Sequence, residues 1–202
     1  MSKKTHKVSK KYILDDYNAE NLTVPDRYMK WIDSNYIGEV SAHWLYIGAS
    51  FVFWSKDIRE MAAEHGETER HHLVIMEHLL RNKQKPRFVF LSKVSGLLLG
   101  ILPSLFGYKT FCMIINIIET SVEDHYNQQI NHLKYKDTEP ELLAVLQRCC
   151  DEEVAHKEDA YKRIYSKKLG LLSSLYFKTI RKIFDLGDKL IDILTYLKEG
   201  DS

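Results

Sequence analysis

The chain has 202 residues, a formal net charge of +1 and 28% charged residues. Its length suits one well-buried domain, and its even charge gives no support for nucleic-acid binding. Its three cysteines, Cys112, Cys149 and Cys150, form no C-x-x-C motif and no even framework, so we expect reduced thiols and not a secreted protein.

Residues 1–24 are polar and predict a basic tail. No apolar stretch follows the lysines near the N-terminus, so neither a secretory nor a transit signal is predicted. A solvated tail is one interpretation, and attraction to anionic lipid is the other. Pro25 suits the first turn of a helix, so we expect the ordered helical region to begin there.

The chain after Pro25 predicts an all-α fold. Apolar residues recur at the helical period over about 25–54, 55–85, 111–133 and 140–161, and no strand-like alternation competes with them. We therefore assign residues 25–166 to one helical bundle. Residues 167–202 predict an additional amphipathic helix that packs on the bundle or lies on a membrane.

The segment 94–108 differs in composition, because it has no charge and contains three glycines and a proline. It is too short for a straight membrane span, which needs about 20 residues. One interpretation is a broken apolar hairpin that contacts a membrane or lines an apolar substrate entrance. The other is a buried core segment with a turn at Pro103-Ser104.

Two Glu-x-x-His pairs, Glu69/His72 and Glu153/His156, are candidate metal ligands. Residues three apart project from one side of a helix toward the same point. Each pair alone is weak evidence, but Glu119 follows an isoleucine-rich stretch. A buried carboxylate needs a partner or a proton, which favours a metal role for Glu119.

Glu39 completes the set, because it supplies a single carboxylate to the first helix pair as Glu119 does to the second. Four carboxylates carry a charge of −4, which two divalent ions would neutralise, and helical bundles hold dinuclear metal sites with such residues. Oxygen and nitrogen ligands suit iron or manganese. The six predicted metal ligands are Glu39, Glu69, His72, Glu119, Glu153 and His156.

Two further residues, His125 and Tyr126, lie about two turns beyond Glu119. Tyr126 should share the face of Glu119, either as a core residue or with a role in proton or electron transfer. We take Tyr126 and His125 as candidate catalytic residues. We expect Asp151 or Glu152 to orient a metal-binding imidazole through a hydrogen bond to the ring nitrogen that does not bind the metal.

The sequence resembles the demethoxyubiquinone hydroxylases of ubiquinone biosynthesis, which are ferritin-like di-iron proteins. The resemblance covers about residues 35–161, and its most specific part is the His-Tyr-Asn-x-Gln-Ile segment. The matching segments are Gly38-Glu-Val-Ser-Ala42 with Tyr46 and Gly48, Glu69-Arg-His-His72-Leu73, Glu119-Thr-Ser-Val-Glu-Asp-His125-Tyr-Asn-Gln-Gln-Ile130, and Asp151-Glu-Glu-Val-Ala-His156.

The resemblance implies a ferritin-like four-helix bundle with a membrane-contacting segment at 94–108. It further implies two iron ions that support O2-dependent hydroxylation of a demethoxyubiquinone ring, with electrons from NADH or the quinol. We expect a peripheral membrane protein on the cytoplasmic face of a bacterial inner membrane, or on the mitochondrial inner membrane in a eukaryote. A membrane-embedded quinone, a protein of ubiquinone biosynthesis and a further copy of the chain are the expected partners.

The chain departs from the family pattern at Tyr36, Ser41 and Ala49, beside the first metal glutamate. These departures leave two alternatives open. One is a ferritin-like di-iron oxidase that acts on another quinol or lipid. The other is a non-catalytic, membrane-associated bundle that binds a quinone.

Overall fold

The computed structural model describes residues 9–80, 86, 88–165 and 182. Within these residues the chain is helical and contains no strand, which confirms the all-α prediction there. The predicted C-terminal helix at 167–202 lies almost wholly outside the described residues. The elements are α1 (Lys10–Asp16), a 3-10 turn η1 (Asp26–Tyr28), α2 (Met29–Ser50), α3 (Lys56–Leu79), α4 (Val89–Leu105), α5 (Tyr108–Lys136) and α6 (Pro140–Tyr165).

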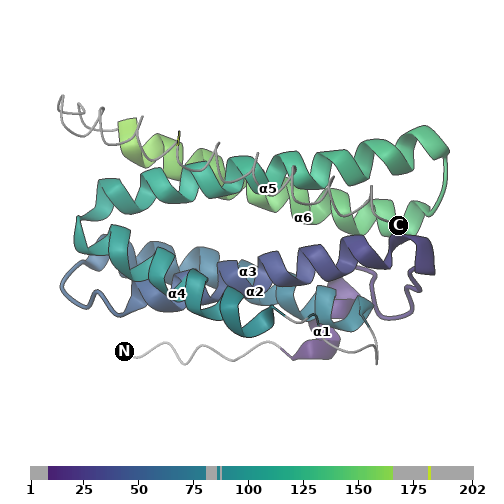
Figure 1. The fold of residues 1–202 in the computed structure, drawn as a ribbon, viewed down its shortest axis with the longest axis horizontal. Helices are drawn as coiled ribbons and strands as arrows, with labels where there is room; N and C mark the ends of the chain where they lie inside the picture. Colours follow the sequence, from purple (N-terminus) through teal and green to yellow (C-terminus); the bar gives the residue numbers. More distant parts are fainter. Residues whose placement is uncertain (1–8, 81–85, 87, 166–181, 183–202) are drawn as a thin grey trace, which may run out of the picture.

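The six helices pack as a bundle in which neighbours along the chain form pairs (Figure 1). Helices α2 and α3 run side by side on one side of the bundle, and α5 and α6 run side by side on the other. Helix α4 packs along α2, and the short α1 packs against α3. Helices α2, α3, α5 and α6 therefore surround a common interior.

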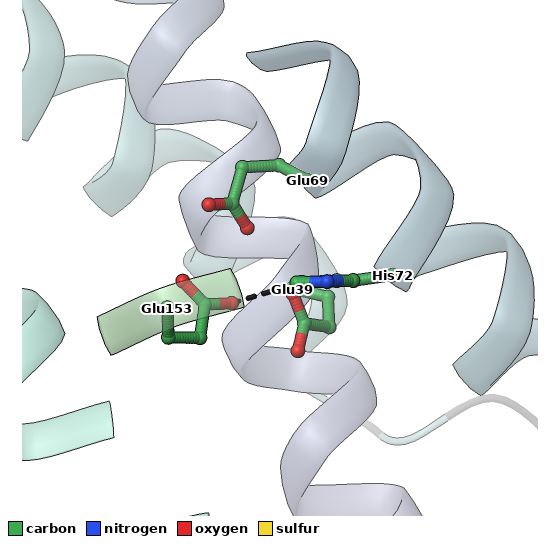
Figure 2. Close-up of side chains that lie close together, drawn as sticks. All are labelled: Glu39, Glu69, His72 and Glu153. Carbon is green, nitrogen blue, oxygen red and sulfur yellow. Dashed lines mark hydrogen bonds and ion pairs between the residues drawn. The ribbon is translucent and has the colours of Figure 1, made fainter. Parts of the chain in front are cut away.

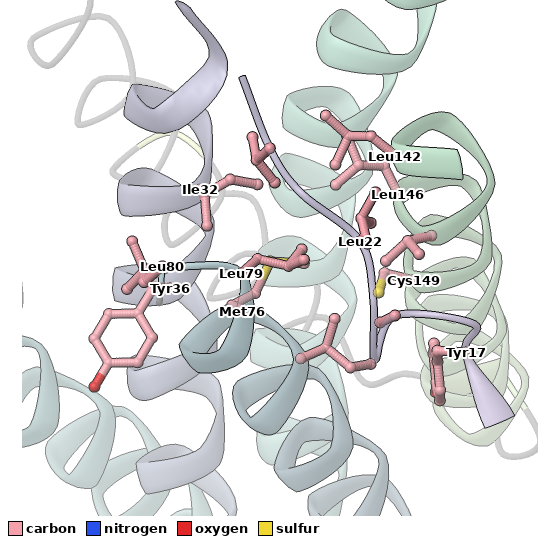
Figure 3. Close-up of a cluster of buried hydrophobic side chains, with 14 of the residues drawn as sticks. Tyr17, Leu22, Ile32, Tyr36, Met76, Leu79, Leu80, Leu142, Leu146 and Cys149 are labelled. Carbon is pink, nitrogen blue, oxygen red and sulfur yellow. The ribbon is translucent and has the colours of Figure 1, made fainter. Parts of the chain in front are cut away.

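Two apolar clusters fill that interior, one toward each end of the long helices. The first, drawn in part in Figure 3, includes Ile32, Leu79, Tyr126 and Leu146. The second includes Leu45, Met61, Phe111, Ile115 and Ala160. On α3, α5 and α6 the predicted metal ligands fall between the residues of the two clusters, and on α2 Glu39 lies next to Val40, the last residue of the first cluster on that helix. A polar layer is thus enclosed by apolar layers.

Several local sequence signals act as expected at the helix ends. Ser55 caps α3, because its hydroxyl accepts a hydrogen bond from the Ile58 N–H at 3.4 Å. Pro140 is the first residue of α6, where its missing N–H costs nothing. Gly66 does not break α3; it gives space for Tyr46, whose Cβ would lie 3.0 Å from an added side chain.

The N-terminal segment corrects the expectation that ordered structure begins near Pro25. Helix α1 lies before it, and Ile13, Leu14, Tyr17 and Leu22 are buried in the first apolar cluster. Figure 3 shows Tyr17 and Leu22 among side chains of the bundle. The flanking lysines hid this short apolar pattern, whose burial depends on contacts with distant helices.

The segment 94–108 also differs from expectation. Helix α4 runs without a break through Pro103, and the chain reverses afterwards at Phe106 and at Gly107, whose φ is 103°. Gly96 and Gly100 lie one turn apart and face α2, where an added Cβ would come within 2.1 Å of Ser41 O and 1.9 Å of Leu45 O. The glycines thus permit a close helix contact and do not mark a turn.

Candidate metal centre

All six predicted metal ligands are buried and meet in the polar layer of the bundle. None is more than 7% exposed. Helices α2 and α5 each provide one glutamate, Glu39 and Glu119. Helix α3 provides the Glu69/His72 pair and α6 provides Glu153/His156. The three-residue spacing places both members of each pair on the interior face of their helix.

The ligand atoms fall into two groups of four that share two glutamates. One group contains Glu39, Glu69, His72 and Glu153, and the other contains Glu69, Glu119, Glu153 and His156. Within each group the candidate ligand atoms lie within 4.8 Å of one another. Figure 2 shows the first group, with the side chains from three helices pointing toward one point. The two shared carboxylates, Glu69 and Glu153, could therefore contribute to a cation in either group.

Both imidazoles present Nδ1 to the carboxylates. His72 Nδ1 lies 2.9 Å from Glu153 Oε1 and 3.6 Å from Glu39 Oε2. His156 Nδ1 lies 3.1 Å from Glu69 Oε1 and 3.4 Å from Glu153 Oε2. The two Nδ1 atoms are therefore the nitrogen donors that face the cluster.

Burial and mutual repulsion of the clustered carboxylates shift the pKa values of several residues in the polar layer. Burial and the neighbouring charge of Glu153 raise the pKa of Glu69 to about 8, and the same causes raise the pKa of Glu119 well above its ordinary range. Burial also opposes the charge on His156, but Glu153 and Glu69 beside it raise its pKa to about 9. The layer holds more negative charge than its histidines can neutralise.

The donor set fits a pair of metal cations. Both carboxyl oxygens of Glu69, Oε2 of Glu153 and Nδ1 of His156 are buried and make no hydrogen bond, although His156 Nδ1 lies within ion-pair distance of Glu69 Oε1 and Glu153 Oε2. Buried polar atoms without a hydrogen bond are costly, and cations would satisfy these atoms together. Four carboxylates and two imidazoles match the oxygen and nitrogen ligands that iron or manganese prefers.

Two tyrosines join the halves of the bundle at the single glutamates. Tyr126 of α5 donates a hydrogen bond to Glu39 Oε1 of α2 at 2.6 Å. Tyr46 of α2 donates to Glu119 Oε1 of α5 at 3.3 Å. Each tyrosine follows the glutamate of its own helix by seven residues and contacts the glutamate of the other. The role of Tyr46 was missed in the sequence, although this repeated spacing could have indicated it.

His125, the second candidate catalytic residue, lies outside the ligand groups. Its Nε2 is 3.0 Å from Asn35 Oδ1 and 2.9 Å from Gln129 Nε2. Asn35 and Gln129 also exchange two hydrogen bonds, of 2.9 and 3.0 Å, across α2 and α5. These contacts involve His125 and Gln129 of the His-Tyr-Asn-x-Gln-Ile segment, so His125 belongs to an amide network one turn from Glu39.

The residues behind the two histidines differ from each other. His72 Nε2 lies 2.8 Å from Glu152 Oε2, so Glu152 and not Asp151 holds this imidazole. Asp151 instead accepts a hydrogen bond from Gln147. The ring of His156 stacks on that of His65 at 4.1 Å between centroids, and His65 Nε2 lies 3.0 Å from Asp159 Oδ2.

A comparison with protein families adds independent information about the chain. The sequence model of the family described as "Ubiquinone biosynthesis protein COQ7" matches residues 26–184. The matched span includes all six ligand candidates and both tyrosines. It therefore contains the complete polar layer and begins after α1.

Curated proteins with similar sequences share the name "NADPH-dependent 3-demethoxyubiquinone 3-hydroxylase, mitochondrial". The Caenorhabditis elegans protein is 29% identical over 133 residues, which are 64% of this chain and 71% of the relative. The mouse protein is 28% identical over 128 residues, 61% of this chain and 59% of the relative. The bovine protein is 28% identical over 149 residues, 72% of this chain and 66% of the relative. The chain thus matches between 59% and 71% of the length of these relatives.

Proposed function

The chain belongs to the family described as ubiquinone biosynthesis protein COQ7, and from this premise we propose that it hydroxylates the ring of a demethoxyubiquinone precursor with O2. The observation that carries the proposal is the pair of buried ligand groups sharing Glu69 and Glu153. This arrangement supports a dinuclear iron centre, as the sequence resemblance implied. The names of the relatives support the substrate and the reaction.

In this proposal Glu39 and His72 would hold one iron ion, Glu119 and His156 would hold the other, and Glu69 and Glu153, which belong to both groups, would be available to each. When bound, the two ions supply the redox chemistry that activates O2. Helices α2, α3, α5 and α6 then form the ferritin-like four-helix core, in which two helices give a glutamate and two give Glu-x-x-His. The buried apolar layers on either side exclude water from the centre.

Tyr126 and Tyr46 act through the ligands that they contact. Burial raises the pKa of both phenols well above the ordinary value, so each hydroxyl keeps its proton and can donate it in a hydrogen bond. Tyr126 orients Glu39, and Tyr46 orients Glu119, before substrate arrives. His125 supports the same region through Asn35, whose helix carries Glu39 one turn later. The predicted transfer of protons or electrons by Tyr126 and His125 is part of this proposal.

The substrate carries an isoprenoid tail, which favours an apolar environment over water. Helix α4 buries its small residues against α2 and exposes large apolar side chains on its other face. The α2–α3 and α4–α5 turns add four more exposed aromatic residues. The exposed residues of this apolar face are Phe51, Phe53, Trp54, Phe90, Leu91, Val94, Leu98, Leu102, Leu105 and Phe106.

We propose that this apolar face rests on a membrane and receives the quinone. Exposed apolar patches of this kind are typical of lipid or ligand contact, and the α4–α5 turn would be the membrane-contacting hairpin. Among the described residues, no helix has the length and apolar character needed to cross a bilayer. The relatives named as mitochondrial support the mitochondrial alternative for the location.

The names of the relatives favour one class of electron donor, whereas the sequence resemblance left two open. Their shared name includes dependence on NADPH, whereas the sequence resemblance implied NADH or the quinol. We propose a reduced nicotinamide as the donor. Parallel reduction of the iron-loaded protein with NADPH, NADH and a quinol would rank the three.

Expression in a ubiquinone-making strain that lacks its own demethoxyubiquinone hydroxylase tests the function. We expect the wild-type chain to convert the accumulated demethoxy precursor to ubiquinone and to bind two iron ions. Glu69→Gln should abolish both, since Glu69 belongs to both ligand groups. Glu60→Gln, an exposed carboxylate on the same helix that pairs with Lys56, is the matched control. Continued accumulation of the precursor with well-folded, iron-loaded protein would contradict this substrate.

A further inference from the structure

Residues 9–24, here called the N-terminal strap, are tied to the bundle at three places. Ile13 and Leu14 of α1 enter the apolar core. The backbone carbonyl of Glu20 lies 2.9 Å from His78 Nε2 of α3. On α6, Arg148 contacts both the carbonyl and the carboxylate of Asp16 at 2.5 Å.

The end of α1 positions Tyr17 beside His72, one of the candidate metal ligands. Asn18 adopts a left-handed conformation with φ of 55°, while its N–H bonds to Asp15 O and the N–H of Ala19 bonds to Leu14 O. This pattern is a Schellman motif, in which Asn is tolerated at the left-handed position. The turn leaves the Tyr17 ring buried, edge-on to the His72 ring at 6.3 Å between centroids and an interplanar angle of 87°.

A chain of hydrogen bonds runs from the strap to a metal ligand. The Tyr17 hydroxyl donates to Glu152 Oε2, and the same oxygen lies 2.8 Å from His72 Nε2. Arg148 donates to the other oxygen, Glu152 Oε1, at 3.2 Å and also covers the Tyr17 ring at 3.7 Å. Both oxygens of Glu152 are therefore engaged, which fixes the carboxylate between strap and ligand.

The hydrogen-bonding capacity of these groups gives the chain its direction. A phenol hydroxyl donates and a carboxylate accepts, so the Tyr17 hydroxyl and the Nε2–H of His72 both donate to Glu152 Oε2. With its proton on Nε2, His72 presents Nδ1 to the cluster, 2.9 Å from Glu153 Oε1.

We propose that Tyr17 is a positioning residue of the metal centre, which acts through Glu152 to fix the orientation and tautomer of His72. This inference rests on the proposed two-metal function. Tyr17 precedes residue 26, where the match to the family begins, so it adds a contact from outside the matched span. His156 is instead backed by the ring of His65 on α3, so the effect of Tyr17 should fall on the ion that His72 would hold.

The test is a titration of the metal-free, full-length protein with Co2+, followed by the visible absorption of the bound ion. The wild-type chain should bind two ions. Tyr17→Phe keeps the ring and its contacts and removes only the hydroxyl. We expect it to weaken one of the two binding steps by about 10-fold and to change the spectrum of that ion, because outer partners of metal-bound histidines have effects of this size. Tyr12→Phe, on an exposed ring of the same helix, should leave both steps unchanged.

A double-mutant cycle separates positioning from general loosening of the strap. Glu152→Gln should weaken the same step, and adding Tyr17→Phe to it should cause little further loss, since the tyrosine acts through that carboxylate. Equal binding and equal spectra in wild type and Tyr17→Phe would overturn the role of Tyr17 alone. Additive losses, or equal weakening of both steps, would also overturn it. A wild-type chain that binds no Co2+ would overturn the metal centre and this inference with it.

Discussion

Tyr126 on α5 donates a 2.6 Å hydrogen bond to Glu39 on α2, and so links the two halves of the bundle at a candidate metal ligand. The reciprocal contact, from Tyr46 to Glu119, is longer at 3.3 Å. Helices α2 and α5 thus repeat one arrangement, in which a tyrosine seven residues after the glutamate contacts the glutamate of the other helix. The difference between the two distances predicts that Tyr126 contributes more to metal affinity than Tyr46.

Tyr126→Phe should weaken metal binding by roughly 10-fold, because it leaves a buried Glu39 oxygen without its donor and a hydrogen bond to a charged group contributes about 1.5–3 kcal/mol. Tyr46→Phe should cause a smaller loss. Competition with a chelator measures both affinities. Tyr135→Phe, an exposed tyrosine on the same helix as Tyr126, is the control. A larger loss for Tyr46→Phe would contradict the ranking.

The metal-free protein should lose stability as the pH rises from about 6.5 to about 9. The pKa of His156 is raised from 6.5 to about 9, so its stabilising contribution is complete below the first value and is lost as the pH passes the second. Glu69, with a pKa raised from 4.5 to about 8, acts in the same direction. Glu152, whose pKa is lowered to about 2, stays ionised throughout this window.

Thermal unfolding at the two ends of that pH window provides the measurement. Metal ions take the place of the protons on Glu69 and His156, so saturating Co2+ should remove most of the decrease. An equal decrease in midpoint with and without Co2+ would show that other groups cause it.

Gly100→Ala should destabilise the protein by about 1–3 kcal/mol, because the added methyl group would meet the α2 backbone at Leu45 O. Gly38→Ala is the matched control on α2, since nothing lies within 4 Å of its added Cβ. It should be neutral or stabilising by up to about 1 kcal/mol, from the better helix propensity of alanine. Urea unfolding of both variants gives the comparison, and similar effects of the two would refute the close contact.

The apolar face of α4 should bind lipid. Replacing Leu98 and Leu102 together by Glu should weaken sedimentation with phosphatidylcholine vesicles by on the order of 100-fold, since each leucine contributes about 1.5 kcal/mol when buried. Tyr135→Glu changes an exposed aromatic residue at the far end of α5 and should have little effect. Unchanged sedimentation of the double variant would exclude this face as the lipid contact.

The clustering of the six candidate ligands was predictable from sequence because helix geometry fixes which residues share a face. Glu69 and His72 must project together once their helix is assigned, and the same holds for Glu153 and His156. Glu39 required a further step, since only its relation to the second helix pair distinguished it from a surface glutamate. The structure brings all these residues together.

The contacts between distant segments were not predictable in the same way. Tyr17 reaches Glu152 across 135 positions of the chain, and no local pattern encodes that distance. The glycines of α4 show a second limit, since composition alone does not separate a turn from a close helix contact. The structure shows that Gly96 and Gly100 both face α2.

The most direct test of the proposed function is a reaction of iron-loaded protein with a short-tailed demethoxyubiquinol, a reduced nicotinamide and isotopically labelled O2. We expect one labelled oxygen atom in the new ring hydroxyl, detected by mass spectrometry, and no product with Glu69→Gln. Label that enters from water, or a product formed equally by Glu69→Gln, would contradict hydroxylation at the centre built from Glu39, Glu69, His72, Glu119, Glu153 and His156.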